Sequence, residues 1–149
     1  MLQDLHTEAG QIAMREGKAA ELRFYQSFTA PPQWIAEDEA KVLAGHDFIV
    51  GDKRVEVKSN SGWNDRDDCP YTTACVEVVT RGGNEVGWKK GGADLLVLIN
   101  RLDWTAHIYN AKVLKRFSYS KRTFIVHDAQ CFRMDWTERR AGYIKTVQL

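Results

Sequence analysis

The segment from Asp94 to Asn100, with the sequence DLLVLIN, most constrains what this chain can fold into. Its apolar residues are consecutive and do not alternate with polar ones, and the run is far too short to span a membrane. A strand of this kind is typically buried on both faces, so we expect it inside a sheet that is covered on both sides. The 149 residues suffice for one domain, residues 1–149, with a substantial core.

The other segments predict an α+β domain that resembles an α/β/α sandwich, with a mixed central sheet and an N-terminal helix. Helical spacing and capping residues predict helices over Thr7–Phe28, Ala36–Ala44 and Ala111–Phe117. Strands are expected over His46–Val50, Lys53–Ser59, Tyr71–Thr80, Asp94–Asn100 and Thr105–Asn110, with one or two short strands after Thr123. The expected order is αβββ-β, with the first three strands forming a meander.

The turn at Gly51-Asp52 fixes the register of the strands on either side of it. Glycine followed by another turn residue, between two β-rich runs, is typical of a two-residue hairpin of the II′ kind. The predicted cross-strand pairs are Val50 with Lys53, Ile49 with Arg54, Phe48 with Val55, and Asp47 with Glu56. Because side chains alternate along a strand, one face is apolar and packs on a helix. The other face carries Asp47, Ile49, Arg54, Glu56 and Lys58.

Two carboxylates placed directly opposite each other are unfavourable as plain structure, because like charges across a ladder repel. A divalent cation between Asp47 and Glu56 would offset that cost, and Mg²⁺ usually takes one or two protein carboxylates. The ammonium of Lys58, on the same face, can orient or deprotonate an attacking water. The alternative is a charged, solvent-facing strand with no catalytic role. The backbone carbonyl of Val57 is a possible third ligand.

Two further acidic residues extend this candidate site. Glu21 lies one helical turn after Gly17, where it can point at the sheet. Glu77 lies on the predicted third strand, on the same side as Thr73 and Cys75, as a further ligand or a group that positions water.

These residues resemble the signature of the PD-(D/E)XK nuclease superfamily, the restriction-endonuclease-like and junction-resolvase-like enzymes. The signature falls on Glu21, Asp47 and Glu56-Val57-Lys58, with His46 where proline commonly precedes the aspartate. The segment TACVEVVTRGG…GW…ADLLVLIN is similar to small phage-type members. The resemblance implies an α-β-β-β-α-β core, dependence on Mg²⁺ or Mn²⁺, and DNA cleavage that leaves a 5′-phosphate. The helix before the last strand would be a single turn around Trp88-Lys89-Lys90, because residues 81–92 contain five glycines.

Basic residues are concentrated near the C-terminus of the sequence. Residues 112–149 contain nine lysines and arginines against three aspartates and glutamates, although the whole chain has a net charge of only +1. This asymmetry suits a protein that binds a polyanion, and it also suits a solvated surface. The candidate nucleic-acid contacts are Asn60, Trp63, Arg66, Trp88, Lys89, Lys90, Lys115, Arg116, Lys121 and Arg122. Trp63 is equally consistent with a loop anchor.

We therefore expect a metal-dependent DNA endonuclease, structure-selective or weakly sequence-specific, in the manner of a junction resolvase or a compact homing or restriction enzyme. The alternative is a nucleic-acid-binding module of the same fold without activity. A homodimer is expected, because two-fold symmetry matches duplex DNA. Three irregularly spaced cysteines read as free thiols of a cytoplasmic protein without zinc, and we expect no membrane segment.

Overall fold

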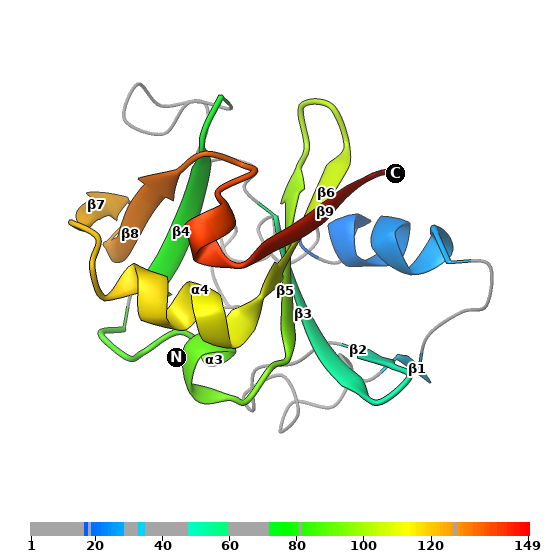
Figure 1. The fold of residues 1–149 in the computed structure, drawn as a ribbon, viewed down its shortest axis with the longest axis horizontal. Helices are drawn as coiled ribbons and strands as arrows, with labels where there is room; N and C mark the ends of the chain where they lie inside the picture. The colour runs from blue at the N-terminus through cyan, green and yellow to red at the C-terminus, as the bar shows by residue number, and fades with distance from the viewer. Residues whose placement is uncertain are drawn as a thin grey trace.

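The computed structural model describes residues 17, 19–28, 33–34, 48–59, 72–80, 82–126 and 128–149. Its main sheet is mixed and six-stranded, in the order β1-β2-β3-β5-β6-β9 (Figure 1). These strands are β1 (Gln33–Trp34), β2 (Phe48–Val50), β3 (Lys53–Ser59), β5 (Leu95–Asn100), β6 (Thr105–Asn110) and β9 (Tyr143–Gln148). β3 and β5 run parallel, and all other neighbours in this sheet are antiparallel. The fold is therefore mixed α+β, as expected.

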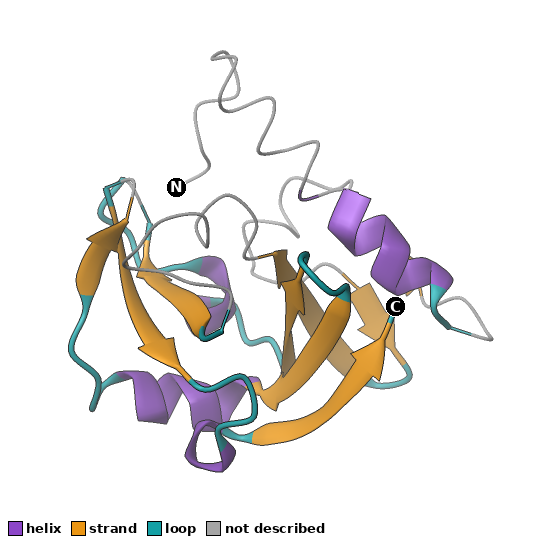
Figure 2. Ribbon diagram, turned by 90° about the horizontal axis from the view of Figure 1, so that it is seen from above, coloured by secondary structure: helices purple, strands orange, loops and turns teal. Residues whose placement is uncertain are grey.

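A second sheet has three antiparallel strands in the order β4-β8-β7. They are β4 (Ala74–Val79), β8 (Ala129–Met134) and β7 (Phe124–Val126). The expectation that the third predicted strand continues a meander beside β3 is wrong, because β4 pairs with β8 and the place beside β3 belongs to β5. We call the three strands the small sheet. Figure 2 shows the two sheets as separate groups of strands.

The helices cover the main sheet on both sides. Residues 17 and 19–26 are helical, and Ala20 and Phe24 from this helix are buried at i and i+4 spacing. On the other side lie the one-turn helix α3 (Gly87–Lys90), α4 (Ala111–Ser118) and the 3-10 turn η1 (Arg139–Ala141). Oδ1 of Asn110 caps α4 by accepting from the backbone N–H groups of Lys112 and Val113. Within the described residues, no helix is long and apolar enough to cross a membrane.

Two buried clusters fill the space on the two faces of the main sheet. Val55, Val57, Val97 and Ile99 pack against helix 19–26 in one cluster. Leu96 and Leu98 point the other way, into a cluster shared with α4, α3 and the small sheet. β5 is thus buried on both faces, which confirms the prediction from its uninterrupted apolar run.

Some expected elements lie outside the described residues. They are the predicted helix over residues 36–44, the first part of the helix predicted over 7–28, the start of the strand at 46–47 and the loop at 60–70. The single turn expected at Trp88-Lys89-Lys90 is confirmed as α3.

Candidate active site

The β2–β3 hairpin that carries the candidate site has the predicted register. Phe48 pairs with Val55, Ile49 with Arg54 and Val50 with Lys53. Gly51 has φ 63°, while Asp52 is not among the residues with positive φ, which is the pattern of a II′ turn. Phe48, Val55 and Val57 are buried together with helix 19–26, so Glu56 and Lys58 project from the opposite face, as predicted.

Glu56 and Lys58 form an ion pair whose members differ strongly in exposure. Nζ of Lys58 lies 3.3 Å from Oε1 of Glu56, with side chains 48% and 4% exposed, respectively. The alternative of a solvent-facing strand does not hold for Glu56, which is buried on the face of β3 opposite to Val55 and Val57. A buried carboxylate is costly unless an opposite charge or hydrogen bonds compensate it. The Lys58 ammonium supplies such a charge while keeping contact with solvent.

Glu77 brings a second carboxylate to the neighbourhood of Lys58 from β4. Burial raises the pKa of the Glu77 carboxyl above its usual value, and the positive charge of Lys58 partly opposes that rise. The strand at Glu77 is held by Trp88, whose Nε1–H donates to the Glu77 carbonyl at 2.9 Å. Lys58 therefore lies within electrostatic reach of two carboxylates, Glu56 on its own strand and Glu77 on the small sheet.

Several predicted site residues lie elsewhere. Asp47, Asn60, Trp63 and Arg66 are outside the described residues, so their predicted roles stay predictions. Glu21 is half-buried on helix 19–26, which packs on the Val55–Val57 face of the sheet. The side chain of Val57 is buried on that same face, and its backbone lies in the strand paired with β5. Neither position tests the catalytic role predicted for Glu21 or the ligand role predicted for the Val57 carbonyl.

The carboxylate oxygens of Glu56 and Glu77 are ligands of the kind that a hard cation prefers. Mg²⁺ and Mn²⁺ prefer oxygen ligands, and Mg²⁺ retains several waters, so one or two carboxylates are enough. Glu56 offers a buried carboxylate on the main sheet, and Glu77 offers a second one from the face of the small sheet that carries Cys75 and Cys131. No group of three or more histidine, cysteine, aspartate or glutamate side chains in the described part of the chain is arranged to hold a metal ion.

The three predicted nucleic-acid contacts at residues 88–90 differ in how far they are exposed to solvent. Trp88 is 3% exposed in the core, so its ring has no free face for a nucleobase, and we assign it a structural role. Lys89 is also largely buried, with Nζ 4.5 Å from the centre of the Tyr119 ring, and burial lowers its pKa. Lys90 is exposed. Both lysines belong to the helical turn Gly87–Lys90, and of the two only Lys90 presents its side chain to solvent.

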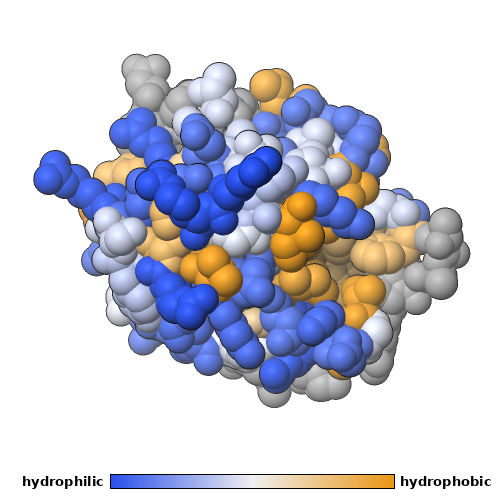
Figure 3. Space-filling view, viewed as in Figure 1, coloured by the Kyte–Doolittle hydropathy of each residue, from blue (hydrophilic) through white to orange (hydrophobic). Residues whose placement is uncertain are grey.

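The α4 side of the molecule carries the remaining predicted contacts. Lys115 lies 3.9 Å from Oε1 of Glu85, while Arg116 and Arg122 are exposed. Nζ of Lys121 lies 5.3 Å from the centre of the Phe117 ring. Figure 3 shows strongly hydrophilic residues gathered over α4 and η1 on this face.

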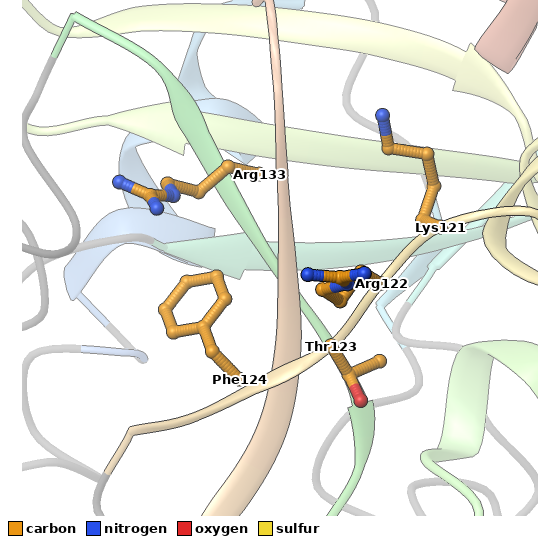
Figure 4. Close-up of a pocket in the computed structure, with 5 residues that line it drawn as sticks. All are labelled: Lys121, Arg122, Thr123, Phe124 and Arg133. Atoms are coloured by element: carbon orange, nitrogen blue, oxygen red, sulfur yellow. The ribbon is translucent and has the colours of Figure 1, made fainter.

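A basic hollow that was not predicted from the sequence lies at the outer edge of the small sheet. It encloses about 270 Å³ and is lined by Lys121, Arg122, Thr123, Phe124 and Arg133 (Figure 4). Lys121 and Arg122 were expected to bind nucleic acid, but Arg133 and Phe124 were not singled out. The alternation in the sequence AQCFRM of β8 could have indicated Arg133, because it places this residue on the face opposite Phe132 and Met134.

Comparisons with protein families, with curated proteins and with solved structures find no match for this chain. The fold is a mixed α+β arrangement whose hairpin carries the Glu56–Lys58 pair. The function therefore has to be argued from the chemistry of that site.

Proposed function

We propose that this protein is a divalent-metal-dependent endonuclease that hydrolyses phosphodiester bonds in DNA. The observation that carries the proposal is the Glu56–Lys58 pair, a buried carboxylate 3.3 Å from a half-exposed ammonium on a strand beside a tight hairpin. A buried, paired carboxylate with a second one nearby is more typical of a functional site than of a solvated face. Glu77, whose pKa is raised by burial, provides the second one.

Each residue has a role in this proposal. Glu56 and Glu77 would hold Mg²⁺ or Mn²⁺ together with Asp47, which the hairpin register predicts opposite Glu56. When bound, the cation supplies charge stabilisation at the phosphate and lowers the pKa of a bound water. The Lys58 ammonium borders solvent, so it can hold a water or a phosphate oxygen beside the buried carboxylate. Glu21 is the assisting acid that the resemblance implies.

The order of elements also supports a PD-(D/E)XK-like enzyme. Along the chain, helix 19–26 is followed by β1, β2 and β3, then by α3 and the parallel strand β5. This matches the α-β-β-β-α-β order of that superfamily if β4 is an addition within the connection. The proposed enzyme is structure-selective or weakly sequence-specific. We propose a homodimer for the two strands of a duplex.

The second candidate is a DNA-binding module without activity. It is favoured by the lack, among the residues that the structure describes, of a side-chain group able to surround a metal ion. It is also favoured by the basic hollow, which needs no catalysis to bind a phosphate.

A cleavage assay separates the two candidates. Supercoiled plasmid, linear duplex, single strand and a four-way junction are incubated with the protein in Mg²⁺, Mn²⁺ or EDTA. The endonuclease predicts metal-dependent cutting of at least one substrate. Binding without cutting in every metal would replace the endonuclease by the binding module, and neither binding nor cutting would contradict both.

A further inference from the structure

We propose that the hollow between the end of α4 and the small sheet binds a phosphate of the DNA backbone, with Arg122 and Arg133 as its clamp. This deepens the proposed function, because it rests on DNA being the ligand and assigns a second contact point away from the hairpin. In the view of Figure 4, the Phe124 ring lies below the Arg133 side chain, and Arg122 lies on the other side of the β8 ribbon. The Lys121 ammonium lies farther away.

The charges in the hollow are only partly compensated by the residues around them, since the Lys121 charge acts on the Glu138 carboxyl. Within the described ranges, Lys121, Arg122 and Arg133 form no ion pair with a carboxylate, while four other basic residues do. Cations held close together repel, so their proximity is explained if an anion binds between them. Arginine is suited to phosphate, because its planar fork donates two parallel hydrogen bonds.

Phe124 holds one side of the clamp in place. The Arg133 guanidinium lies 5.0 Å from the centre of the Phe124 ring, which is within the range of a cation–π contact. Phe124 itself packs on a buried cluster that contains Cys75 and Cys131. The guanidinium therefore rests on an anchored ring, which reduces the entropy lost when it binds an anion.

The size of the hollow favours a phosphate over a cofactor. Its volume of about 270 Å³ is below the range of roughly 300–1,000 Å³ that is typical of small-molecule clefts. Arg122 and Thr123 are exposed at its rim, so a chain can enter and leave along the surface. A phosphodiester that passes across the hollow satisfies both conditions.

The strand register relates the hollow to the candidate active site. Glu77 pairs with Cys131, which in turn pairs with Phe124, so all three side chains project from one face of the small sheet. Two strand spacings separate the backbones at Glu77 and Phe124, which is about 10 Å. A phosphate in the hollow would therefore lie on the order of 10 Å from one near Glu77, along the same face of the small sheet. The hollow would thus fix the position of the cut strand.

The test is DNA binding measured by fluorescence anisotropy in EDTA, where cleavage cannot contribute. The double variant Arg122→Gln/Arg133→Gln is compared with Lys53→Gln/Lys145→Gln, which removes two exposed charges from the main sheet. We expect binding by the first variant to weaken about tenfold or more, and the slope of log affinity against log salt to fall by about two. The control should weaken less than about twofold, and thermal unfolding confirms that both variants are folded.

Three results would overturn the inference. They are equal losses in the two double variants, an unchanged affinity in the hollow variant, and a wild type that binds inorganic phosphate but no DNA. Phe124→Leu keeps an apolar side chain without the ring and should weaken binding by a smaller factor than the double variant. Because binding is read without metal, a protein that binds through the hollow but never cuts would support this inference and contradict only the endonuclease.

Discussion

Nζ of Lys58 lies 3.3 Å from Oε1 of Glu56, although Lys58 exposes about half of its side chain and Glu56 almost none. The two residues are i and i+2 on β3, so they project from the same face of the strand. The ion pair therefore mainly compensates the cost of burying the Glu56 carboxylate. The Lys58 ammonium would be well solvated even without Glu56.

This asymmetry predicts unequal effects of removing either partner. Lys58→Ala leaves the buried Glu56 carboxylate without this ammonium and should lower the free energy of unfolding by about 1–3 kcal/mol. Glu56→Gln removes the buried charge and leaves Lys58 in water, so it should cost less than Lys58→Ala or stabilise the protein. Urea unfolding without divalent ions measures both. Equal losses, or a larger loss for Glu56→Gln, would contradict the pairing.

The effect of Mg²⁺ on the stability of the same two variants tests whether Glu56 is a metal ligand. If Glu56 is a metal ligand, Mg²⁺ stabilises the wild type and Lys58→Ala but not Glu56→Gln, because a ligand that binds the folded state shifts unfolding. Lys53→Ala, an exposed lysine on the same strand, serves as the control and should respond to Mg²⁺ like the wild type. A Mg²⁺ effect that persists unchanged in Glu56→Gln would remove Glu56 from the proposed site.

Gly142 is predicted to be intolerant of a side chain. It has φ +80°, and a Cβ there would lie 2.9 Å from Cβ of Val113 and 3.1 Å from the carbonyl oxygen of Asn110. Gly142→Ala should therefore cost about 2–4 kcal/mol, from the left-handed backbone and from the contact with α4. Gly83→Ala is the matched control, because Gly83 has φ +83° but nothing within 4 Å, and should cost about 1–2 kcal/mol. Similar losses at the two positions, measured by urea unfolding, would contradict the contact argument.

His107 predicts a pH dependence of stability. Its ring is buried against Trp136, with Nε2 2.8 Å from Oγ1 of Thr105 and Nδ1 3.0 Å from Oγ1 of Thr146. The Thr105 hydroxyl donates to Asp103, so it accepts from Nε2–H, which assigns the neutral tautomer whose Nδ1 accepts from the Thr146 hydroxyl.

Burial lowers the pKa of His107 below its usual value of 6.5, and the negative charge of Asp103 partly opposes this. The unfolded chain therefore takes up the proton first as the pH falls. The stability contribution is complete above pH 6.5 and is lost as the pH drops towards the lower pKa of the folded state. Glu77, with its raised pKa, has the opposite dependence. The measurement is thus the difference between wild type and His107→Gln, which should shrink from about pH 7.5 to about pH 5.5. A difference that is constant over this interval would contradict the shift.

The elements that follow from local pattern were predictable from the sequence. The Gly51-Asp52 turn and the alternation around it fixed the pairing of Val50 with Lys53 and of Phe48 with Val55. The uninterrupted run at Leu95–Asn100 indicated a strand covered on both faces, because a half-exposed strand would alternate. The side of β3 that carries Glu56 and Lys58 follows from the same alternation.

The pairings between distant segments were not predictable in this way. Nothing in Ala74–Val79 distinguishes a strand beside β3 from one that pairs with β8, since both choices bury the same alternating residues. The burial of Glu56 was not predictable either, because it depends on which distant segments cover that face of β3. The place of Arg133 in the hollow was not predictable for the same reason. Its neighbours there come from the segment between α4 and β7.

The most direct test of the central claim is the rate at which the protein nicks supercoiled plasmid in Mg²⁺, compared among wild type, Lys58→Ala and Lys53→Ala. The endonuclease proposal predicts cutting by wild type that EDTA abolishes, a rate at least about a hundredfold lower for Lys58→Ala, and little change for Lys53→Ala. Cutting that survives in Lys58→Ala at the wild-type rate, with that variant folded, would show that Glu56 and Lys58 are not the active site.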